Sequence, residues 1–198
     1  MRESMVSNIH ARATARPRQQ LDKDRLISAA FLVLERDGLD GLSMRPLAAE
    51  LGVQAPALYW HIGDKAELLR LMARVVYAQA RAEVGEQADW RAWLLGFGRS
   101  LRRTYASYRD GARLCAIAKA PDDKADITYH AQRIAAPLVA LGLSQSRALS
   151  FEASVISFAL GWASFEANGS MHLYLDEMLS FDESFETGLA ALVRGFSD

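Results

Sequence analysis

One local pattern recurs along almost the whole chain: apolar residues at helical spacing, preceded by a capping residue and followed by a glycine. The first such segment follows Asp22 and ends at Gly38, because glycine readily takes the left-handed conformation that closes a helix. Its apolar residues recur at helical spacing and are Leu26, Ile27, Ala30, Phe31 and Leu34. The sequence contains no strand-like alternation bounded by hairpin turns. The pattern therefore predicts an all-α fold.

The same signals place further helices. Asp64 and Glu67 have the spacing of a capping box. Pro56 suits the first turn of a helix, where its missing N–H is harmless. Pro137 predicts a kink within its own helix. We expect helices over residues 43–51, 54–61, 64–83 and 89–107, a short one after Asp110, and others over 124–141, 145–168 and 182–196.

The composition limits the class of protein. Hydrophobic residues make up 51% of the 198 residues, which is enough to bury a substantial core. Cys115 is the only cysteine, so an internal disulfide framework is excluded and a reducing, cytoplasmic compartment is expected. Residues 1–20 lack the apolar stretch of a secretory signal, and no apolar run approaches the roughly 18 residues of a membrane span. We therefore expect no membrane association.

Charge is distributed unevenly along the chain. Residues 1–81 carry 12 Lys and Arg against 9 Asp and Glu, a balance of +3, whereas residues 82–198 carry 11 against 15, a balance of −4. A basic N-terminal part would orient toward a polyanion such as DNA. The alternative is that the charge difference is chance variation between two solvated surfaces. Residues 1–20 hold several arginines and almost no large apolar residues. They are expected to form a disordered basic arm, which either touches DNA or is only a tail.

Residues 43–62 carry the most informative pattern. Two short helices are joined there by a tight turn at Gly52 and Val53. Ala48 and Ala49 are small where the helices must cross closely, and apolar side chains such as Leu47 supply the core between them. This is the design of a helix-turn-helix, whose second helix enters the major groove of DNA.

The second of these helices has more side chains than the core of the domain can bury, so some are expected to be exposed. Pro56 and Ala57 suit contact with thymine methyl groups, and Tyr59 and His61 suit hydrogen bonds to phosphates. Arg45, on the preceding helix, is the best candidate for bidentate contact with guanine.

Lys65 and the free N–H groups at the start of the next helix form an anion site suited to the DNA backbone. A structural alternative stays open for these residues. Tyr59 and Trp60 would then only close the core of the domain, and Arg45 would only pair with Glu50.

Several short motifs stand out over residues 21–70: Leu21-Asp22-Lys23, Leu51-Gly52-Val53 and Leu58-Tyr59-Trp60-His61, followed by Lys65 and Leu68-Leu69. Together they closely resemble the DNA-binding head of the tetracycline-repressor (TetR) family. The resemblance implies operator-contacting positions at Arg45, Pro56, Ala57, Tyr59, Trp60, His61 and Lys65. Gln54 and Ala55 stand where the family varies its base readers, and Ser43 and Met44 complete the candidate set. Met44 and Ala57 replace polar residues of the tetracycline repressor, so its operator sequence is not assumed.

A fainter resemblance continues along the chain. Trp90 and residues 109–112 resemble the sensor body of the family, and residues 158–161 resemble its dimerisation helix. This implies a homodimer in which residues 145–168 and 182–196 of both subunits form a four-helix bundle, unless these apolar faces only fill a monomer core. We divide the chain into a basic arm at 1–20, a helix-turn-helix domain at 21–66 and a helical ligand-binding and dimerisation domain at 67–198.

Two departures concern the metal chemistry of the tetracycline repressor. By the resemblance, its magnesium-binding histidine falls at Cys115 and an associated acid falls near Phe165. A neutral thiol and a phenyl ring are poor ligands for a hard cation, which prefers oxygen. We therefore expect no metal, no cofactor and no tetracycline.

The resemblance also implies a pocket lined by Arg81, Phe97, Leu101, Cys115, Ala118, Lys119, Ser157, Trp162 and Phe165. Such a set suits a small, largely apolar or aromatic effector with one anionic or polar group. Each of these residues is equally compatible with a place in the core.

No motif supports catalysis. The histidines are scattered, Cys115 has no recognisable partner base, and neither a P-loop nor a dinucleotide fingerprint is present. The sequence predicts a ligand-responsive repressor rather than an enzyme, released from a near-palindromic operator in double-stranded DNA by its effector. The alternatives are a small-molecule-binding or protein-interaction module that keeps the head as a structural remnant, and an activator or co-regulator that uses the same contacts.

Overall fold

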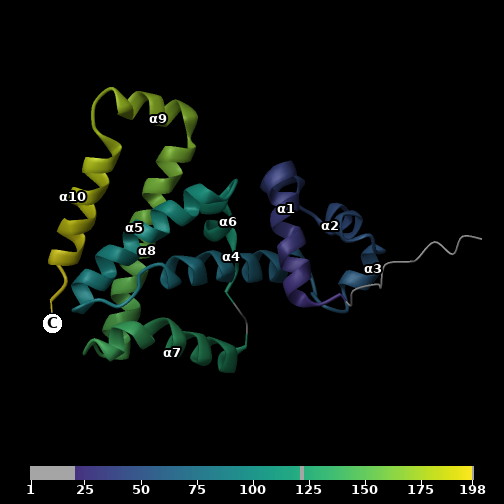
Figure 1. Cartoon of the computed structure of the whole chain (residues 1–198), viewed down its shortest axis with the longest axis horizontal. Helices are drawn as coiled ribbons and strands as arrows, with labels where there is room; N and C mark the ends of the chain where they lie inside the picture. The colour runs from purple at the N-terminus through teal and green to yellow at the C-terminus, as the bar shows by residue number, and fades with distance from the viewer. Residues whose placement is uncertain (1–20, 121–122, 198) are drawn as a thin grey trace, which may run out of the picture.

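The computed structural model describes residues 21–120 and 123–197. Every regular element within those residues is a helix, which confirms the predicted fold class. The predicted arm at 1–20 lies outside the described residues. Figure 1 shows an elongated molecule in which α1 to α3 form a head at one end and the later helices form a larger body.

The head is built from three helices: α1 (Lys23–Gly41), α2 (Met44–Leu51) and α3 (Ala55–Leu58). Asp22 caps α1 as predicted, because its Oδ1 accepts a hydrogen bond from the N–H of Arg25 at 2.8 Å. Gly38 has a φ of 71°, so the helical conformation breaks where the sequence predicted the end of the helix, and one further turn follows.

The turn after α2 depends on Gly52. Its φ of 65° lies in the left-handed region, which a residue with a Cβ enters at a cost of about 1 kcal/mol. The N–H of Gly52 donates to the carbonyl of Ala49 at 3.1 Å, and the N–H of Val53 donates to that of Ala48 at 3.0 Å. These bonds end α2 and direct the chain into α3.

The third helix is shorter than predicted. It ends at Leu58 instead of continuing to about His61, and residues 59–61 form a turn. The N–H groups of His61 and Ile62 both return to the carbonyl of Leu58, at 2.9 and 3.0 Å. This turn places Ile62 in the core of the head, where it is 1% exposed.

One helix, α4 (Lys65–Ala82), belongs to both the head and the body. Its start confirms the capping box: Asp64 Oδ1 accepts from the N–H of Glu67 at 2.7 Å. The carboxylate of Glu67 in turn accepts from the N–H of Gly63 at 2.8 Å. The expected domain boundary after residue 66 falls inside this helix.

Within the part of the chain that the structure describes, the rest of the body contains six helices: α5 (Trp90–Ser107), α6 (Gly111–Ile117), α7 (Lys124–Ala140), α8 (Gln145–Ala167), α9 (Gly169–Asp176) and α10 (Phe181–Arg194). The sequence did not predict α9. Asn168 ends α8 and also caps α9, accepting from the N–H of Met171 at 3.3 Å. Figure 1 shows α9 joining α8 to α10 at one edge of the body.

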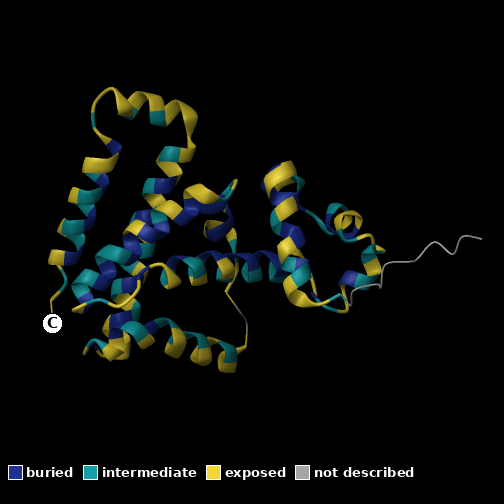
Figure 2. Cartoon of the chain, viewed as in Figure 1, coloured by how far each residue is buried: buried dark blue, intermediate teal, exposed yellow. Residues whose placement is uncertain are grey.

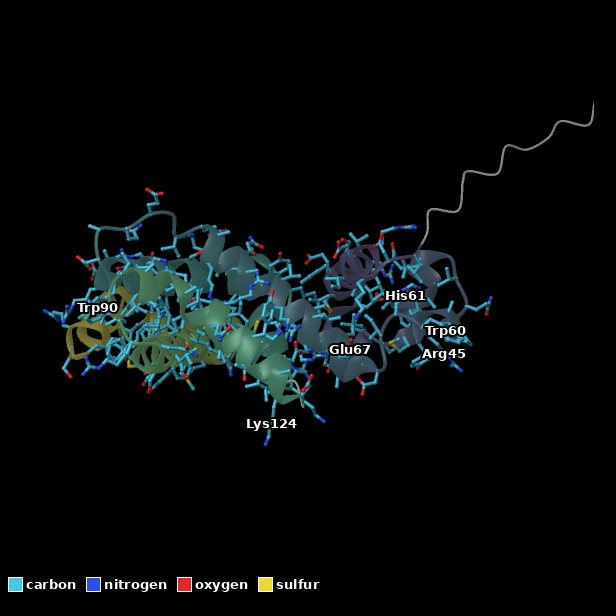
Figure 3. All side chains as sticks on the ribbon, turned by 90° about the horizontal axis from the view of Figure 1, so that it is seen from below. Arg45, Trp60, His61, Glu67, Trp90 and Lys124 are labelled. Carbon is cyan, nitrogen blue, oxygen red and sulfur yellow. The ribbon has the colours of Figure 1, made fainter. Side chains whose placement is uncertain are left out.

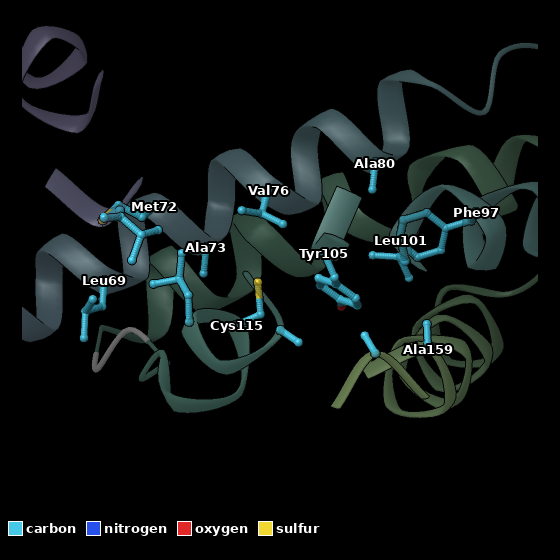
Figure 4. Close-up of a cluster of buried hydrophobic side chains, with 14 of the residues drawn as sticks. Leu69, Met72, Ala73, Val76, Ala80, Phe97, Leu101, Tyr105, Cys115 and Ala159 are labelled. Atoms are coloured by element: carbon cyan, nitrogen blue, oxygen red, sulfur yellow. The ribbon is translucent and has the colours of Figure 1, made fainter. Parts of the chain in front are cut away.

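The core of the body lies between α4 and α5. Figure 4 shows Met72, Val76 and Ala80 along one side of α4, with Phe97 and Leu101 of α5 in the same cluster. All five are fully buried. Figure 2 shows the contrast between this buried interior and α9, which is exposed over most of its length.

The longest helix, α8, is strongly apolar. Among the described residues it alone is long and apolar enough to cross a membrane by length and composition, with a mean hydropathy of 1.3. No apolar segment of that length was predicted from the sequence. However, α8 packs against α5, α7 and α10, and it buries the carboxylate of Glu152 to 1% exposure. Only 33% of its apolar stretch is buried, so packing within the body covers part of this helix and leaves the rest exposed.

Candidate nucleic-acid interface and ligand cavity

The tip of the head carries exposed aromatic side chains. Figure 3 shows Arg45 and Trp60 at the end of the head that lies away from the body. Trp60 is 89% exposed and Tyr59 is 53% exposed, so neither closes the core of the head. Leu58 and Ile62, at most 1% exposed, do this instead. The structural alternative for the two aromatic residues is therefore wrong.

Arg45 is also available for an outside contact. Its side chain is exposed and has no ion-pair partner among the described residues. Glu50 pairs instead with Arg36, whose Nη1 lies 2.7 Å from its carboxylate. The alternative in which Arg45 pairs with Glu50 is therefore wrong, and the guanidinium is free to meet a base edge.

The other DNA-contact candidates come from the start of α2, from α3 and the turn after it, and from the first residue of α4. Exposed among them are Gln54, Pro56 and Lys65. Half-buried are Ser43, Met44, Ala55, Ala57 and His61. Met44 and Ala55 also pack against the buried cluster, so they support the surface as well as belonging to it. Their contact with DNA stays a prediction.

A cavity of about 730 Å³ opens in the body between α4, α6, α7 and α8. This volume is in the range of pockets that bind small molecules, roughly 300 to 1,000 Å³. Part of its wall is apolar and includes Tyr77, Ile134, Leu149 and Ile156.

The nine residues predicted for the pocket separate into two groups. Four of them line the cavity: Arg81, Cys115, Ala118 and Lys119. The other five do not. Phe97 and Leu101 are completely buried in the core (Figure 4). Ser157 and Phe165 are exposed on α8, and Trp162 packs its ring 6.1 Å from that of Phe185. A long apolar helix does not reveal by sequence which of its faces lines a cavity.

Sequence reasoning missed the α7 wall and most of the α4 wall. The missed residues with polar or aromatic side chains are Arg70, Arg74, Tyr77, His130, Arg133 and Glu152. One signal was present, because Arg70, Arg74 and Arg81 share one face of a helix at spacings of four and seven. The contribution of α7 depends on tertiary packing and had no local signal.

The cavity wall is predominantly cationic. Among the described lining residues there are five arginine or lysine side chains, namely Arg70, Arg74, Arg81, Lys119 and Arg133. Within the same set of described residues, the single carboxylate is that of Glu152. Asp126 lies near one end, 3.1 Å from Arg74 and 3.7 Å from Arg70. The hydrogen bond from Arg74 holds the pKa of Asp126 below its ordinary value. Lys119 and Arg133 have no acidic partner within the described chain.

Glu152 is the most buried polar group of the wall. Its Oε2 lies 2.7 Å from Nη2 of Arg81, and the side chain is 1% exposed. Burial raises the pKa of Glu152, and the neighbouring Arg81 opposes that shift. The other oxygen, Oε1, has no hydrogen-bond partner in the described structure.

The residues present do not fit a magnesium ion. Cys115 is 8% exposed on the wall, and burial raises the pKa of its thiol to about 12, so it stays protonated at neutral pH. Phe165 lies outside the cavity. Within residues 21–120 and 123–197, no group of three or more His, Cys, Asp or Glu is arranged to hold a metal ion. An excess of cationic side chains would also repel a divalent cation.

The start of α6 is tied to the head. Nη1 of Arg109 donates to the carbonyls of Glu35 and Arg36 at 2.9 and 2.7 Å. Asp110 Oδ2 accepts from the backbone N–H of Leu39 at 2.8 Å. Arg113 forms two hydrogen bonds with the carboxylate of Asp40, at 2.9 and 2.6 Å. The helix that contributes Cys115 to the cavity is therefore bonded to the end of α1.

These features together define a helix-turn-helix protein with a helical body that contains a cavity. Comparison with known proteins agrees with this class. Residues 26–72 match the family model of bacterial regulatory proteins of the tetR family, and residues 84–177 match the tetracyclin repressor-like C-terminal domain. The chain belongs to the TetR family of bacterial regulatory proteins.

Three relatives illustrate the similarity. The class A tetracycline repressor protein from transposon 1721 of Escherichia coli is 43% identical over 97 residues, which cover 48% of this chain and 45% of that protein. A TetR variant from Acinetobacter baumannii AYE in complex with minocycline is 34% identical, with a TM-score of 0.70 over 89% of this chain and 97% of that chain. Class A TetR in complex with 5a,6-anhydrotetracycline and magnesium is 34% identical, with a TM-score of 0.65 over 88% and 97%.

The chain spans about half the length of the curated tetracycline repressors that it matches. These relatives are regulators and not enzymes, in agreement with the lack of catalytic motifs in the sequence.

Proposed function

We propose that this protein is a cytoplasmic, dimeric transcriptional repressor that binds a near-palindromic operator and releases it when a small, largely apolar or aromatic effector enters the cavity. The observation that carries this proposal is the double role of α6. One end of this seven-residue helix is hydrogen-bonded to the head, and Cys115 near its other end lines the cavity. A ligand that displaces α6 therefore acts on the position of the head.

DNA binding is assigned to the tip of the head. Arg45 reads a base edge, while Tyr59, His61 and Lys65 contact phosphates. The exposure of Trp60 supports this assignment, because an indole that is 89% exposed contributes little to folding. The remaining members of the contact surface are Ser43, Met44, Gln54, Ala55, Pro56 and Ala57.

A palindromic operator requires two heads related by two-fold symmetry. We assign the dimer contact to α8 and α10. The exposed face of α8 carries small residues four positions apart, at Ser157 and Gly161. Small residues allow a second helix to approach closely, and α10 packs against α8 within the same body.

Release follows from a shift between two arrangements of the dimer. The effector must bind more tightly to the arrangement whose heads are wrongly spaced for DNA, since only differential affinity moves such an equilibrium. Both helices that contact the head from the body, α4 and α6, also line the cavity.

A gel shift with the full-length protein tests the DNA-binding half of the proposal. The probe is the DNA immediately upstream of its own gene, and unrelated DNA serves as competitor. We expect a specific complex whose affinity falls steeply with salt, because phosphate contacts release counterions. Absence of a complex at low salt would contradict the proposal.

Mutation distinguishes the proposed repressor from a ligand-binding module whose head does not bind DNA. In the repressor, Arg45→Ala weakens the DNA complex, whereas Arg103→Ala on the exposed face of α5 does not. Equal behaviour of both variants would favour the module. A reporter gene fused to the same upstream DNA distinguishes a repressor from an activator. Deletion of the gene for this protein raises transcription of the reporter only if the protein is a repressor.

A further inference from the structure

Several polar groups of the cavity are left incomplete by its own residues, among them Nε of Arg81 and Nε2 of His130, which have no hydrogen-bond partner in the described structure. Two features matter most for a ligand. The first is an excess of positive charge, since Lys119 and Arg133 line the cavity without an acidic partner among the described residues. Within those residues, Arg133 donates to the hydroxyl of Tyr129 at 3.2 Å, and its guanidinium lies 5.6 Å from that ring. Both cationic side chains are exposed, so solvent weakens their mutual repulsion, and an anion placed between them is attracted by both charges.

The second feature is an unused acceptor. Glu152 is 99% buried, and its Oε2 is engaged by Arg81, but Oε1 has no partner in the described structure. A buried carboxylate oxygen that has lost water and gained no donor is unfavourable. A ligand that brings an O–H or N–H group to this point satisfies it.

These two features come from different elements of the cavity wall: Lys119 follows α6, Arg133 belongs to α7 and Glu152 belongs to α8. Arg74 and Arg81 are seven residues apart on α4, which corresponds to about 10 Å along the helix axis. Glu152 is paired with Arg81, whereas Arg74 is paired with Asp126 at the start of α7. Between them the wall is formed partly by Tyr77, Leu149 and Ile156, which offer contact to apolar or aromatic groups.

We infer that the effector is an amphipathic aromatic acid with two points of polar attachment. Its anionic group is held by Lys119 and Arg133, its rings lie against the apolar wall, and an O–H or N–H group donates to Oε1 of Glu152. This inference rests on the proposed function in so far as the cavity is the effector site. It extends that function by specifying the charge and the hydrogen-bonding character of the ligand.

Three fluorescent dyes with one ring system test the inference on the full-length protein. The first is an anilinonaphthalene sulfonate, which carries an anion and an N–H donor. The second is its N-methyl derivative, which lacks the donor. The third is the corresponding N-phenylnaphthylamine, which lacks the sulfonate. Saturable binding is measured from the rise in dye fluorescence.

For the wild-type protein we expect the sulfonate dye to bind about tenfold more tightly than either partner dye, as is typical of one charge-assisted hydrogen bond. Equal affinity of the sulfonate and sulfonate-free dyes overturns the anion site. Equal affinity of the N–H and N-methyl dyes overturns the donor site. Failure of the sulfonate dye to bind saturably overturns both.

Two variants assign the effects to residues. Lys119→Gln with Arg133→Gln is expected to remove the preference for the sulfonate. The control, Arg103→Gln with Arg147→Gln, removes the same charge from exposed positions outside the cavity and is expected to keep it. Persistence of the preference in the cavity variant contradicts the assignment.

Glu152→Gln keeps the size of the side chain but presents an amide N–H₂ where Oε1 was, because the amide oxygen faces Arg81. We expect this variant to bind the N–H and N-methyl dyes equally. If Glu152→Gln does not fold, as judged by circular dichroism, the wild-type comparison of the two dyes still decides the donor site. Gel shifts are run separately, so dye binding as predicted without an operator complex would overturn the proposed function alone.

Discussion

At the scale of single residues, several capping groups were predictable, whereas most of the cavity wall was not. Asp22 and Asp64 cap their helices as the sequence indicated, because a cap is a local contact over three residues. Arg81 was expected at the ligand site, but its partner Glu152 lies 71 residues away and had no local signal. Groups that meet only after the chain has folded leave no trace in a short sequence window.

Glycine is required at position 52 by the backbone conformation and not by a lack of space for a larger side chain. A Cβ at this position would meet nothing within 4 Å, but the φ of 65° is left-handed. We therefore expect Gly52→Ala to lower the free energy of unfolding by about 1 kcal/mol. Urea denaturation of the full-length protein measures this change. Gly85→Ala, at a φ of 66° and also with open space, is the matched comparison and should show a similar loss.

Substitution of Arg45 and substitution of Lys65 should weaken DNA binding in different ways. Loss of a bidentate guanine contact in Arg45→Ala costs about 1 to 3 kcal/mol of binding at one base pair and relaxes specificity there. Loss of a phosphate contact in Lys65→Ala weakens binding to all sequences and lowers the salt slope by about one. Titrations on the operator and on single-base variants at several salt concentrations measure both quantities. The same response in both variants would contradict the division of roles.

At the scale of helices, the elements with a buried face were predicted and α9 was not. None of the residues of α9 is buried, and its eight residues are too few for a helical period to stand out in the sequence. The third helix was predicted too long for a related reason. The sequence predicted that the helix continues through Tyr59 and Trp60. In the structure, a tight turn that returns to the carbonyl of Leu58 buries Ile62 instead.

The contact between α6 and α1 should carry the response to effector. Asp110→Ala removes the acceptor for the N–H of Leu39, and we expect effector to release DNA less completely from this variant. Asp110→Asn is the control, because an amide oxygen can still accept that bond and asparagine tolerates the φ of 55°. Gel shifts with and without effector measure the coupling. An unchanged response in Asp110→Ala would show that this hydrogen bond does not transmit the signal.

At the scale of the whole molecule, the outer face of α8 is the place to test assembly. Ser157→Arg would bring two positive charges together across the two-fold axis, so we expect a monomer that keeps its helical content but no longer binds DNA. Gln132→Arg adds the same charge to an exposed position on α7 and should leave the dimer intact. Light scattering after gel filtration gives the mass, with 21.9 kDa expected for a monomer. A dimer that persists in Ser157→Arg would place the interface elsewhere.

The continuity of α4 also limits how proteins of this design can be recombined. Its buried residues Leu68, Met72, Val76 and Ala80 follow one another every four positions, the first near the head and the last deep in the body. Adding one residue between Met72 and Val76 would rotate one half against the other by about 100° and turn a buried stripe toward solvent. A head with a new DNA specificity can therefore be grafted onto this body only by a crossover that keeps the helical phase of α4.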